Sequence, residues 1–110
     1  MSAGAKDWMR QRVSAVLLIP LSLWLLWAGA TLAGADYDTT TRFFSAPLHA
    51  IAASLLAVIG LFHTQKGTQG IIEDYAPESL QTLLSLVSKA GCTIGAIVVL
   101  YTMARLTLGA

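Results

Sequence analysis

Residues 13–34 read VSAVLLIPLSLWLLWAGATLAG and contain no charged side chain over 22 positions. A transmembrane helix needs about 20 apolar residues to cross the hydrocarbon core of a bilayer. A cleaved signal peptide has a shorter apolar region of about 7–15 residues. The length therefore favours a membrane-spanning helix, although Ala28-Gly29-Ala30 resembles a cleavage site. Pro20 removes one backbone donor in the middle of the stretch, and we expect a kink there.

A second apolar stretch is uncharged from Phe43 to Phe62. Ser45 is its predicted N-cap, and Pro47 fits the first turn, where a missing N–H costs nothing. The helical pattern meets no strong breaker at the end of the uncharged part. We therefore expect this helix to continue out of the membrane to about Ile72.

A third stretch runs from about Leu80 to Leu108. As a helix it would be about 43 Å long, against about 30 Å for the hydrocarbon core, so its first two turns are expected in the interface. Gly91 and Gly95 form a G-x-x-x-G pattern, which lets helices approach closely. The sequence thus predicts an all-α single domain over residues 1–110. Its three transmembrane helices lie at about 13–34, 43–72 and 80–108, with short loops at 35–42 and 73–79.

The composition excludes several classes of protein. Of the 110 residues, 55% are hydrophobic and 12% are charged, whereas soluble domains carry about 25% charged residues. So little charge excludes a disordered chain and a soluble globular enzyme. A net charge of +1 without a basic face excludes a nucleic-acid binder. The single cysteine, Cys92, excludes an intrachain disulfide framework, a cysteine-based zinc cluster and the C-x-x-C-H pattern of covalently attached haem.

The positive charges predict the orientation of the chain in the membrane. Five of the seven lysines and arginines fall on the side of the N-terminus and of the loop between the second and third helices: Lys6, Arg10, Arg12, Lys66 and Lys89. Arg42 and Arg105 fall on the opposite side. The positive-inside rule therefore places the N-terminus in the cytoplasm and the C-terminus outside. The absence of a presequence fits a multi-pass protein of a bacterial plasma (cell inner) membrane. Three such helices make a poor independent bundle, so we expect the chain to complete a larger assembly.

His63 stands out because ionisable groups at membrane depth are rare and usually functional. Neutral imidazole carries no charge and is a good iron ligand. Gly60, Gly67 and Gly70 share one helical stripe with it, which leaves room for a flat macrocycle or for a closely packed helix. From the residues alone, two interpretations remain open: a metal ligand, or a histidine that is hydrogen-bonded across a helix interface.

His49 precedes His63 by fourteen residues. The two side chains face the same way but lie about 21 Å apart along the helix, so they cannot ligate one iron. Each could ligate one of two stacked haems, if a partner supplied two further histidines. An interfacial or interhelical His49 is the favoured interpretation.

Asp74 and Tyr75 follow as the second helix leaves the membrane. A phenol can donate a hydrogen bond to a quinone carbonyl, and an adjacent carboxylate can orient it; the alternative is a polar turn with an interfacial tyrosine. Arg12 lies where the first helix enters the membrane. It either contacts headgroups or pairs with a haem propionate in bidentate fashion. Lys89 is expected to reach the cytoplasmic interface with its ammonium group.

Together these residues resemble the small membrane-anchor subunit of succinate dehydrogenase, respiratory complex II. That family has three transmembrane helices. The second carries the axial haem b histidine, with an Asp-Tyr pair eleven and twelve residues later. The segment HTQKGTQGIIEDYAP matches this pattern with His63, Gly67, Asp74 and Tyr75. The segment QRVSAVLL at Arg12 is similar to the start of the first helix in the family.

The resemblance implies a function. His63 would be one axial ligand of the iron of haem b, Tyr75 would bind ubiquinone with Asp74 beside it, and Arg12 would lie near the propionates. The second axial histidine would come from the larger cytochrome b anchor subunit, with which this chain would form a heterodimeric anchor bundle. A flavoprotein and an iron–sulfur subunit would pass electrons from succinate oxidation to the quinone pool, so the chain alone would not be an enzyme. Lys66 would lie near the porphyrin edge or face the headgroups.

Three other functions remain open at this stage. The chain could be a haem-free structural anchor. It could be a cytochrome b subunit of another quinone oxidoreductase, including a dihaem type that uses His49. It could also be a small ion or proton transport component with a path through Lys89, His63 and Asp74.

Overall fold

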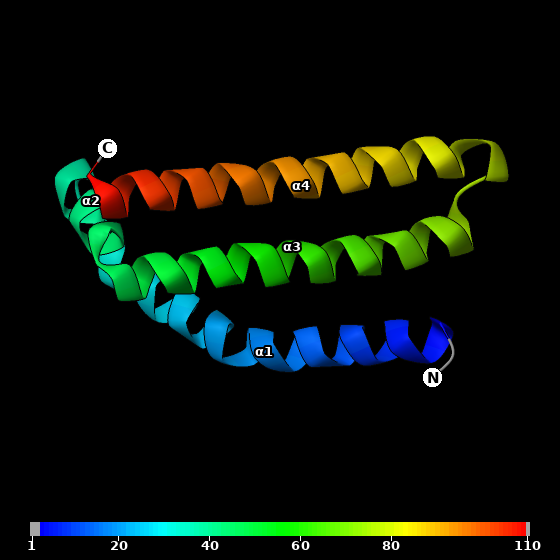
Figure 1. Ribbon diagram of the computed structural model, residues 1–110, viewed down its shortest axis with the longest axis horizontal. Coiled ribbons are helices and arrows are strands. Elements are labelled where there is room, and N and C mark those ends of the chain that lie inside the picture. The colour runs from blue at the N-terminus through cyan, green and yellow to red at the C-terminus, as the bar shows by residue number, and fades with distance from the viewer. Residues whose placement is uncertain (1–2, 110) are drawn as a thin grey trace.

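The computed structural model describes residues 3–109, and these form four helices with no strand. The helices are Ala3–Leu32 (α1), Tyr37–Ser45 (α2), Pro47–Tyr75 (α3) and Glu78–Leu108 (α4). The three long helices alternate in direction, and α3 lies between α1 and α4 (Figure 1). The N-terminus and the α3–α4 turn share one end of the molecule, while α2 and the C-terminus share the other. The predicted single domain includes residues 1, 2 and 110, which lie outside the described part.

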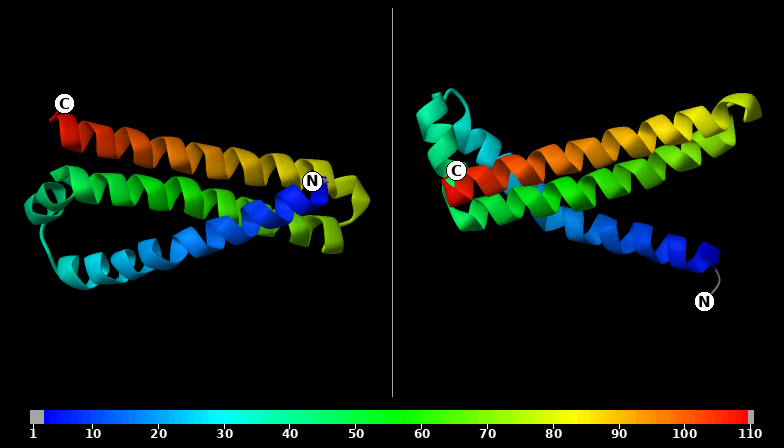
Figure 2. Two further views of the ribbon diagram at one scale, coloured as in Figure 1. Left: turned by 60° about the horizontal axis from the view of Figure 1, so that its bottom comes forward. Right: turned by 45° about the horizontal axis from the view of Figure 1, so that its top comes forward.

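All three long helices are long and apolar enough to cross a membrane, namely Gly4–Leu32, Pro47–Tyr75 and Glu78–Leu108. The predicted all-α fold with three spans is therefore confirmed. α1 crosses α3 obliquely, whereas α3 and α4 run close together along their length (Figure 2). Large apolar side chains face outward, with Leu26 71% and Leu48 74% exposed. The buried apolar residues of the described chain are Ala28, Ala50 and Ile72, so the outer faces are left for lipid or other subunits.

α1 begins at Ala3 instead of near Val13, so residues ahead of the predicted span are helical as well. Most residues between Ala3 and Val13 are good helix formers, and Asp7 and Arg10 form an exposed ion pair at 3.6 Å one turn apart. The helix stays continuous through Pro20, and its ribbon bends in the half that follows this residue (Figure 1).

The expected loop at 35–42 was wrong, because residues 37–45 form the short helix α2. Asp36 caps this helix, since its carboxylate accepts a 2.8 Å hydrogen bond from the backbone N–H of Thr39. Hydrogen bonding with the side chain and the backbone N–H of Thr39 lowers the pKa of Asp36 below its usual value. Residues 37–45 are mostly polar, so apolar periodicity does not predict this helix, which is stabilised by the Asp36 cap.

The boundary between α2 and α3 also differs from the prediction. Ser45 is the last residue of α2, where its hydroxyl donates to the carbonyl of Thr41 at 2.7 Å, and it is not an N-cap. α3 begins at Pro47, which lies in the first turn as predicted. Proline disfavours helical geometry in the residue before it, and Ala46 is extended (φ −68°, ψ 127°). The second span therefore starts at Pro47 and not at Phe43.

The same effect ends α3. Pro77 holds Ala76 extended (φ −79°, ψ 145°), so α3 runs to Tyr75 and α4 starts at Glu78. Between these helices, a Cβ added at Gly95 would lie 3.3 Å from Leu61 Cδ1, whereas nothing lies within 4 Å of one added at Gly91. Of the predicted glycine pair, only Gly95 permits the close approach of α3 and α4.

Candidate functional site

His63 lies half-buried on α3, opposite Ser14 of α1. Its Nδ1 is 3.0 Å from Ser14 Oγ, and Ser14 is only 6% exposed. The Ser14 hydroxyl in turn donates a 2.9 Å hydrogen bond to the carbonyl oxygen of Gln11. A hydroxyl has one proton and a carbonyl can only accept. The arrangement that satisfies both contacts is therefore His63 Nδ1–H to Ser14 Oγ, and Ser14 Oγ–H to Gln11.

This hydrogen-bond chain decides which nitrogen of His63 is open to a ligand. With the proton on Nδ1, the lone pair of the neutral ring is on Nε2. Nε2 has no hydrogen-bond partner within residues 3–109. Metal-bound histidines commonly donate the other ring N–H to a protein oxygen, which fixes the tautomer and the orientation of the ring. When the ring is neutral, this arrangement leaves Nε2 of His63 as the atom that can bind a metal.

Gln11 of α1 makes a second contact with His63 of α3. Its Nε2 donates to the backbone carbonyl of His63 at 3.5 Å, and its Oε1 is buried without a hydrogen-bond partner in the described chain. Gly60 and Gly67 face α1, because Cβ atoms there would lie 3.7 Å from Leu18 and 3.9 Å from Gln11. Gly60 and Gly67 therefore allow α1 to pack closely against α3. Gly70 does not contribute to this contact, because nothing lies within 4 Å of a Cβ added there.

Sequence reasoning missed Ser14 and Gln11. Their shared depth with His63 could not be read from the predicted spans, because α1 was expected to begin near Val13 and not at Ala3. Ser14 lies eleven residues after the start of α1 at Ala3, and His63 lies twelve residues before the end of α3 at Tyr75. Because the two helices are antiparallel and these ends share one end of the bundle, the nearly equal offsets bring the residues to about the same level.

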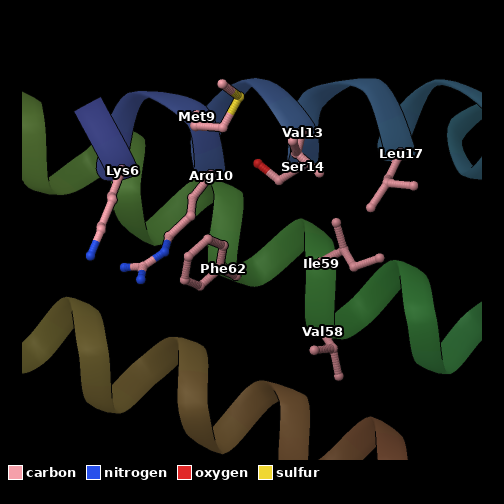
Figure 3. Close-up of a pocket in the computed structure, with 9 residues that line it drawn as sticks. All are labelled: Lys6, Met9, Arg10, Val13, Ser14, Leu17, Val58, Ile59 and Phe62. Atoms are coloured by element: carbon pink, nitrogen blue, oxygen red, sulfur yellow. The ribbon is translucent and has the colours of Figure 1, made fainter. Parts of the chain in front are cut away.

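An apolar pocket of about 460 Å³ opens between α1 and α3 beside Ser14 (Figure 3). Its walls include Val13, Leu17 and Phe62, while Lys6 and Arg10 extend from α1 toward α3 at its N-terminal end. His63 does not line this pocket itself. An apolar groove with two cations at one end suits an amphiphile with an acidic end.

The structure does not bring Arg12, Asp74 or Tyr75 into contact with His63. Arg12 is exposed, and its guanidinium carbon lies 5.2 Å from the centroid of the Trp8 ring. Asp74 and Tyr75 end α3, about 17 Å along the helix axis from His63. Tyr75 is 83% exposed, and neither side chain forms a hydrogen bond within residues 3–109. All three lie toward the end of the bundle that carries the N-terminus. They remain open to a partner or ligand.

A polar contact joins α3 and α4 at the same end. Gln69 Nε2 donates to Ser85 Oγ at 2.9 Å and to Glu73 Oε1 at 3.2 Å. An open polar pocket of about 530 Å³ next to it includes Lys66 and Lys89 in its lining. Lys89 lies eleven residues after the start of α4 at Glu78, nearer to this end of the helix than to the other.

The transport path considered from the sequence gains no support. Its three residues, Lys89, His63 and Asp74, are not joined by hydrogen bonds or ion pairs anywhere in the described chain.

His49 lies in an aromatic cluster at the other end of α3. Trp24 Nε1 donates to His49 Nδ1 at 3.3 Å, and the Phe43 ring stacks on the imidazole at a centroid distance of 4.0 Å. An indole N–H only donates, so Nδ1 of a neutral His49 is the acceptor and Nε2 holds the proton. The expected interhelical role of His49 is confirmed. In this tautomer Nε2 has no lone pair for a metal, which argues against the dihaem alternative.

Three helices of membrane length define a small multi-pass membrane protein. No group of three or more His, Cys, Asp or Glu side chains that could hold a metal ion occurs among residues 3–109. A family model described as succinate dehydrogenase/fumarate reductase transmembrane subunit matches residues 1–104. The chain belongs to this family.

The chain is also similar to several proteins described as membrane anchor subunits of succinate dehydrogenase. The succinate dehydrogenase hydrophobic membrane anchor subunit of Rickettsia felis is 29% identical over 101 residues, covering 89% of this chain and 84% of that protein. Its counterpart in Rickettsia bellii is 30% identical over 73 residues, or 66% of this chain, and the match spans 58% of that protein's length. The succinate dehydrogenase membrane anchor subunit of Reclinomonas americana is 31% identical over 87 residues, covering 76% and 72% of the two chains. No solved structure matches the chain significantly.

Proposed function

We propose that this chain is the small membrane anchor of a bacterial succinate dehydrogenase, where it provides one axial ligand of haem b and part of a ubiquinone site. The observation that carries the proposal is the state of His63, whose Nδ1 is bonded to Ser14 while Nε2 is open. The family to which the chain belongs supplies the context.

The residues around His63 fit a haem. One neutral imidazole is half of the ligand set of a bis-histidine haem, and the second histidine would come from the larger cytochrome b anchor subunit. The positive side chains in the N-terminal part of α1, namely Lys6, Arg10 and Arg12, suit the propionates. When bound, haem b supplies a one-electron redox centre; this chain orients the ligand and offers positive charge.

The quinone site would lie at the end of α3. Tyr75 would donate a hydrogen bond from its phenol to a carbonyl of ubiquinone, and Asp74 beside it would orient the phenol or hold a proton. Their exposure and lack of internal partners support this role. The flavoprotein and iron–sulfur subunits would dock at the same end, which the positive-inside rule assigns to the cytoplasmic side of the cell inner membrane.

The test is a reduced-minus-oxidised absorption spectrum of the complex purified through a tag on this chain. We expect a b-type haem band that is lost or shifted in the His63→Ala complex. The matched control is His49→Ala, which should keep the band because His49 is bonded to Trp24. An intact complex without haem, or an unchanged band in His63→Ala, would refute the ligand role of His63.

A further inference from the structure

Membrane spanning does not by itself explain the contact between Ser14 and His63. We propose that Ser14 is a positioning residue for His63. It keeps the ring proton on Nδ1, holds the plane of the ring, and so presents the Nε2 lone pair as a ligand. This inference deepens the proposed haem-ligand function and rests on it.

The carbonyl oxygen of Gln11 fixes the direction of the hydrogen-bond chain that runs through Ser14 to His63. The carbonyl of Gln11 accepts the Ser14 proton at 2.9 Å, so the serine oxygen can only accept from His63. The Gln11 side chain donates to the backbone carbonyl of His63, which ties the two helices together at this level. Two contacts from one turn of α1 therefore hold both the backbone and the ring of His63.

Ser14 is also buried between the helices. Ser14 is 6% exposed, so water has little access to replace its hydroxyl. Loss of the hydroxyl would leave the His63 Nδ1–H without an acceptor in a low-dielectric site, which favours another rotamer or the other tautomer. Ser22, on the same helix, is exposed and has no hydrogen bond from its side chain in the described part of the chain. It provides a matched control.

The other histidine of α3, His49, has a different hydrogen-bond partner at Nδ1. When both rings are neutral, α3 holds its two histidines in opposite tautomers, because the indole N–H of Trp24 donates to Nδ1 of His49 while the Ser14 hydroxyl accepts from Nδ1 of His63. The tautomer of each ring follows from the chemistry of one residue on α1. The hydrogen bond with Ser14 thus leaves Nε2 free to bind a metal at His63, whereas the hydrogen bond from Trp24 does not do so at His49.

A test that does not depend on haem reads the tautomers directly. The full chain, labelled with ¹⁵N in its histidines and placed in lipid nanodiscs, should show at neutral pH one ring protonated at Nδ1 and one protonated at Nε2. Spectra of His49→Gln and His63→Gln assign the two. The Nδ1–H signal should belong to His63 and should be lost or reduced in Ser14→Ala but not in Ser22→Ala. His63 protonated at Nε2 in the wild-type chain would overturn the inference.

The second test uses the assembled complex. Ser14→Ala should weaken haem retention by about 10- to 100-fold, the usual effect of removing a hydrogen-bond partner of a metal ligand. It should also raise the haem midpoint potential, since a less basic imidazole stabilises ferric iron less. Ser14→Thr keeps the hydroxyl and should restore both properties, and Ser22→Ala should change neither.

The two tests separate the inference from the function beneath it. A haem that depends on His63 but keeps its potential and retention in Ser14→Ala would overturn the role of Ser14 alone. A wild-type complex without haem would overturn the proposed function, and the nanodisc spectra would still decide the tautomer of His63.

Discussion

The side chain of Tyr75 is 83% exposed and forms no hydrogen bond within residues 3–109. Such a residue contributes little to the stability of the fold. A functional change at this position can therefore be separated from a structural one, which is not true of the half-buried His63.

Tyr75→Phe removes one hydroxyl and leaves the ring. A hydrogen bond to a neutral carbonyl contributes about 0.5–1.5 kcal/mol, so quinone reduction should weaken by about 2- to 10-fold in kcat/KM. Succinate oxidation with an artificial acceptor should stay within experimental error of the wild type. Tyr37→Phe is the control, since Tyr37 is 80% exposed at the opposite end of the molecule. Equal losses in both assays for Tyr75→Phe would indicate a structural role instead.

At the scale of the element, α3 and α4 approach each other closely at Gly95. A Cβ at Gly95 would meet Leu61 at 3.3 Å, and a larger side chain would force the helices apart. We expect Gly95→Leu to destabilise the folded chain by about 1–3 kcal/mol, the range for overpacking a well-packed contact. Gly91→Leu adds the same side chain to open space on the same helix. Chemical denaturation of the chain in mixed micelles compares the two; equal destabilisation would contradict this account of the glycine pair.

The cap of α2 predicts a dependence on pH. The pKa of Asp36 is lowered in the folded state by hydrogen bonding with Thr39, so the deprotonated form stabilises the helix. This contribution is present above the ordinary aspartate pKa of about 3.9 and is lost as the pH falls through the lower folded value. Protection of the Thr39 amide from hydrogen exchange should therefore hold from pH 7 to pH 5 and decrease below about pH 4. Asp36→Asn, which still caps the helix, should remove this dependence; the same loss in the asparagine variant would assign it to another group.

These elements also show what the sequence could and could not predict. The spans were predictable because uncharged stretches of membrane length have few other uses, and Pro47 and Pro77 mark boundaries through their effect on the preceding residue. The helix α2 was not predictable from apolar periodicity, because the Asp36 cap and the Thr41–Ser45 hydrogen bond are local polar contacts. His63 was identifiable as an ionisable residue at membrane depth.

Ser14 was different. A serine within an apolar span carries no signal until antiparallel packing brings it level with a histidine 49 residues away. The same holds for Trp24 and His49, which are 25 residues apart and meet only through the packing of α1 on α3. Candidate ligands can therefore be found from residue type and depth, whereas the residues that orient them depend on the register between helices.

At the scale of the whole molecule, the three spans bury few apolar residues against one another, and their outer faces remain exposed. A subunit of this kind gains stability from what binds to its folded form. A ligand that binds only the folded state adds RT ln(1 + [L]/Kd), which is about 2.7 kcal/mol at a free concentration of 100 Kd. Haem held between His63 and a partner histidine would act in this way on the whole anchor.

Depletion of haem should therefore lower the thermal stability of the assembled complex, measured as dissociation of this subunit from the detergent-solubilised complex on heating. Complexes from cells with blocked haem synthesis should dissociate at a lower temperature than complexes from untreated cells. In His63→Ala the two preparations should behave alike, because the ligand that couples haem to this chain is absent. In His49→Ala the difference should persist, since His49 Nδ1 accepts from Trp24 and its Nε2 holds the proton. A haem effect of equal size in His63→Ala would mean that haem stabilises the complex through other subunits and not through α3.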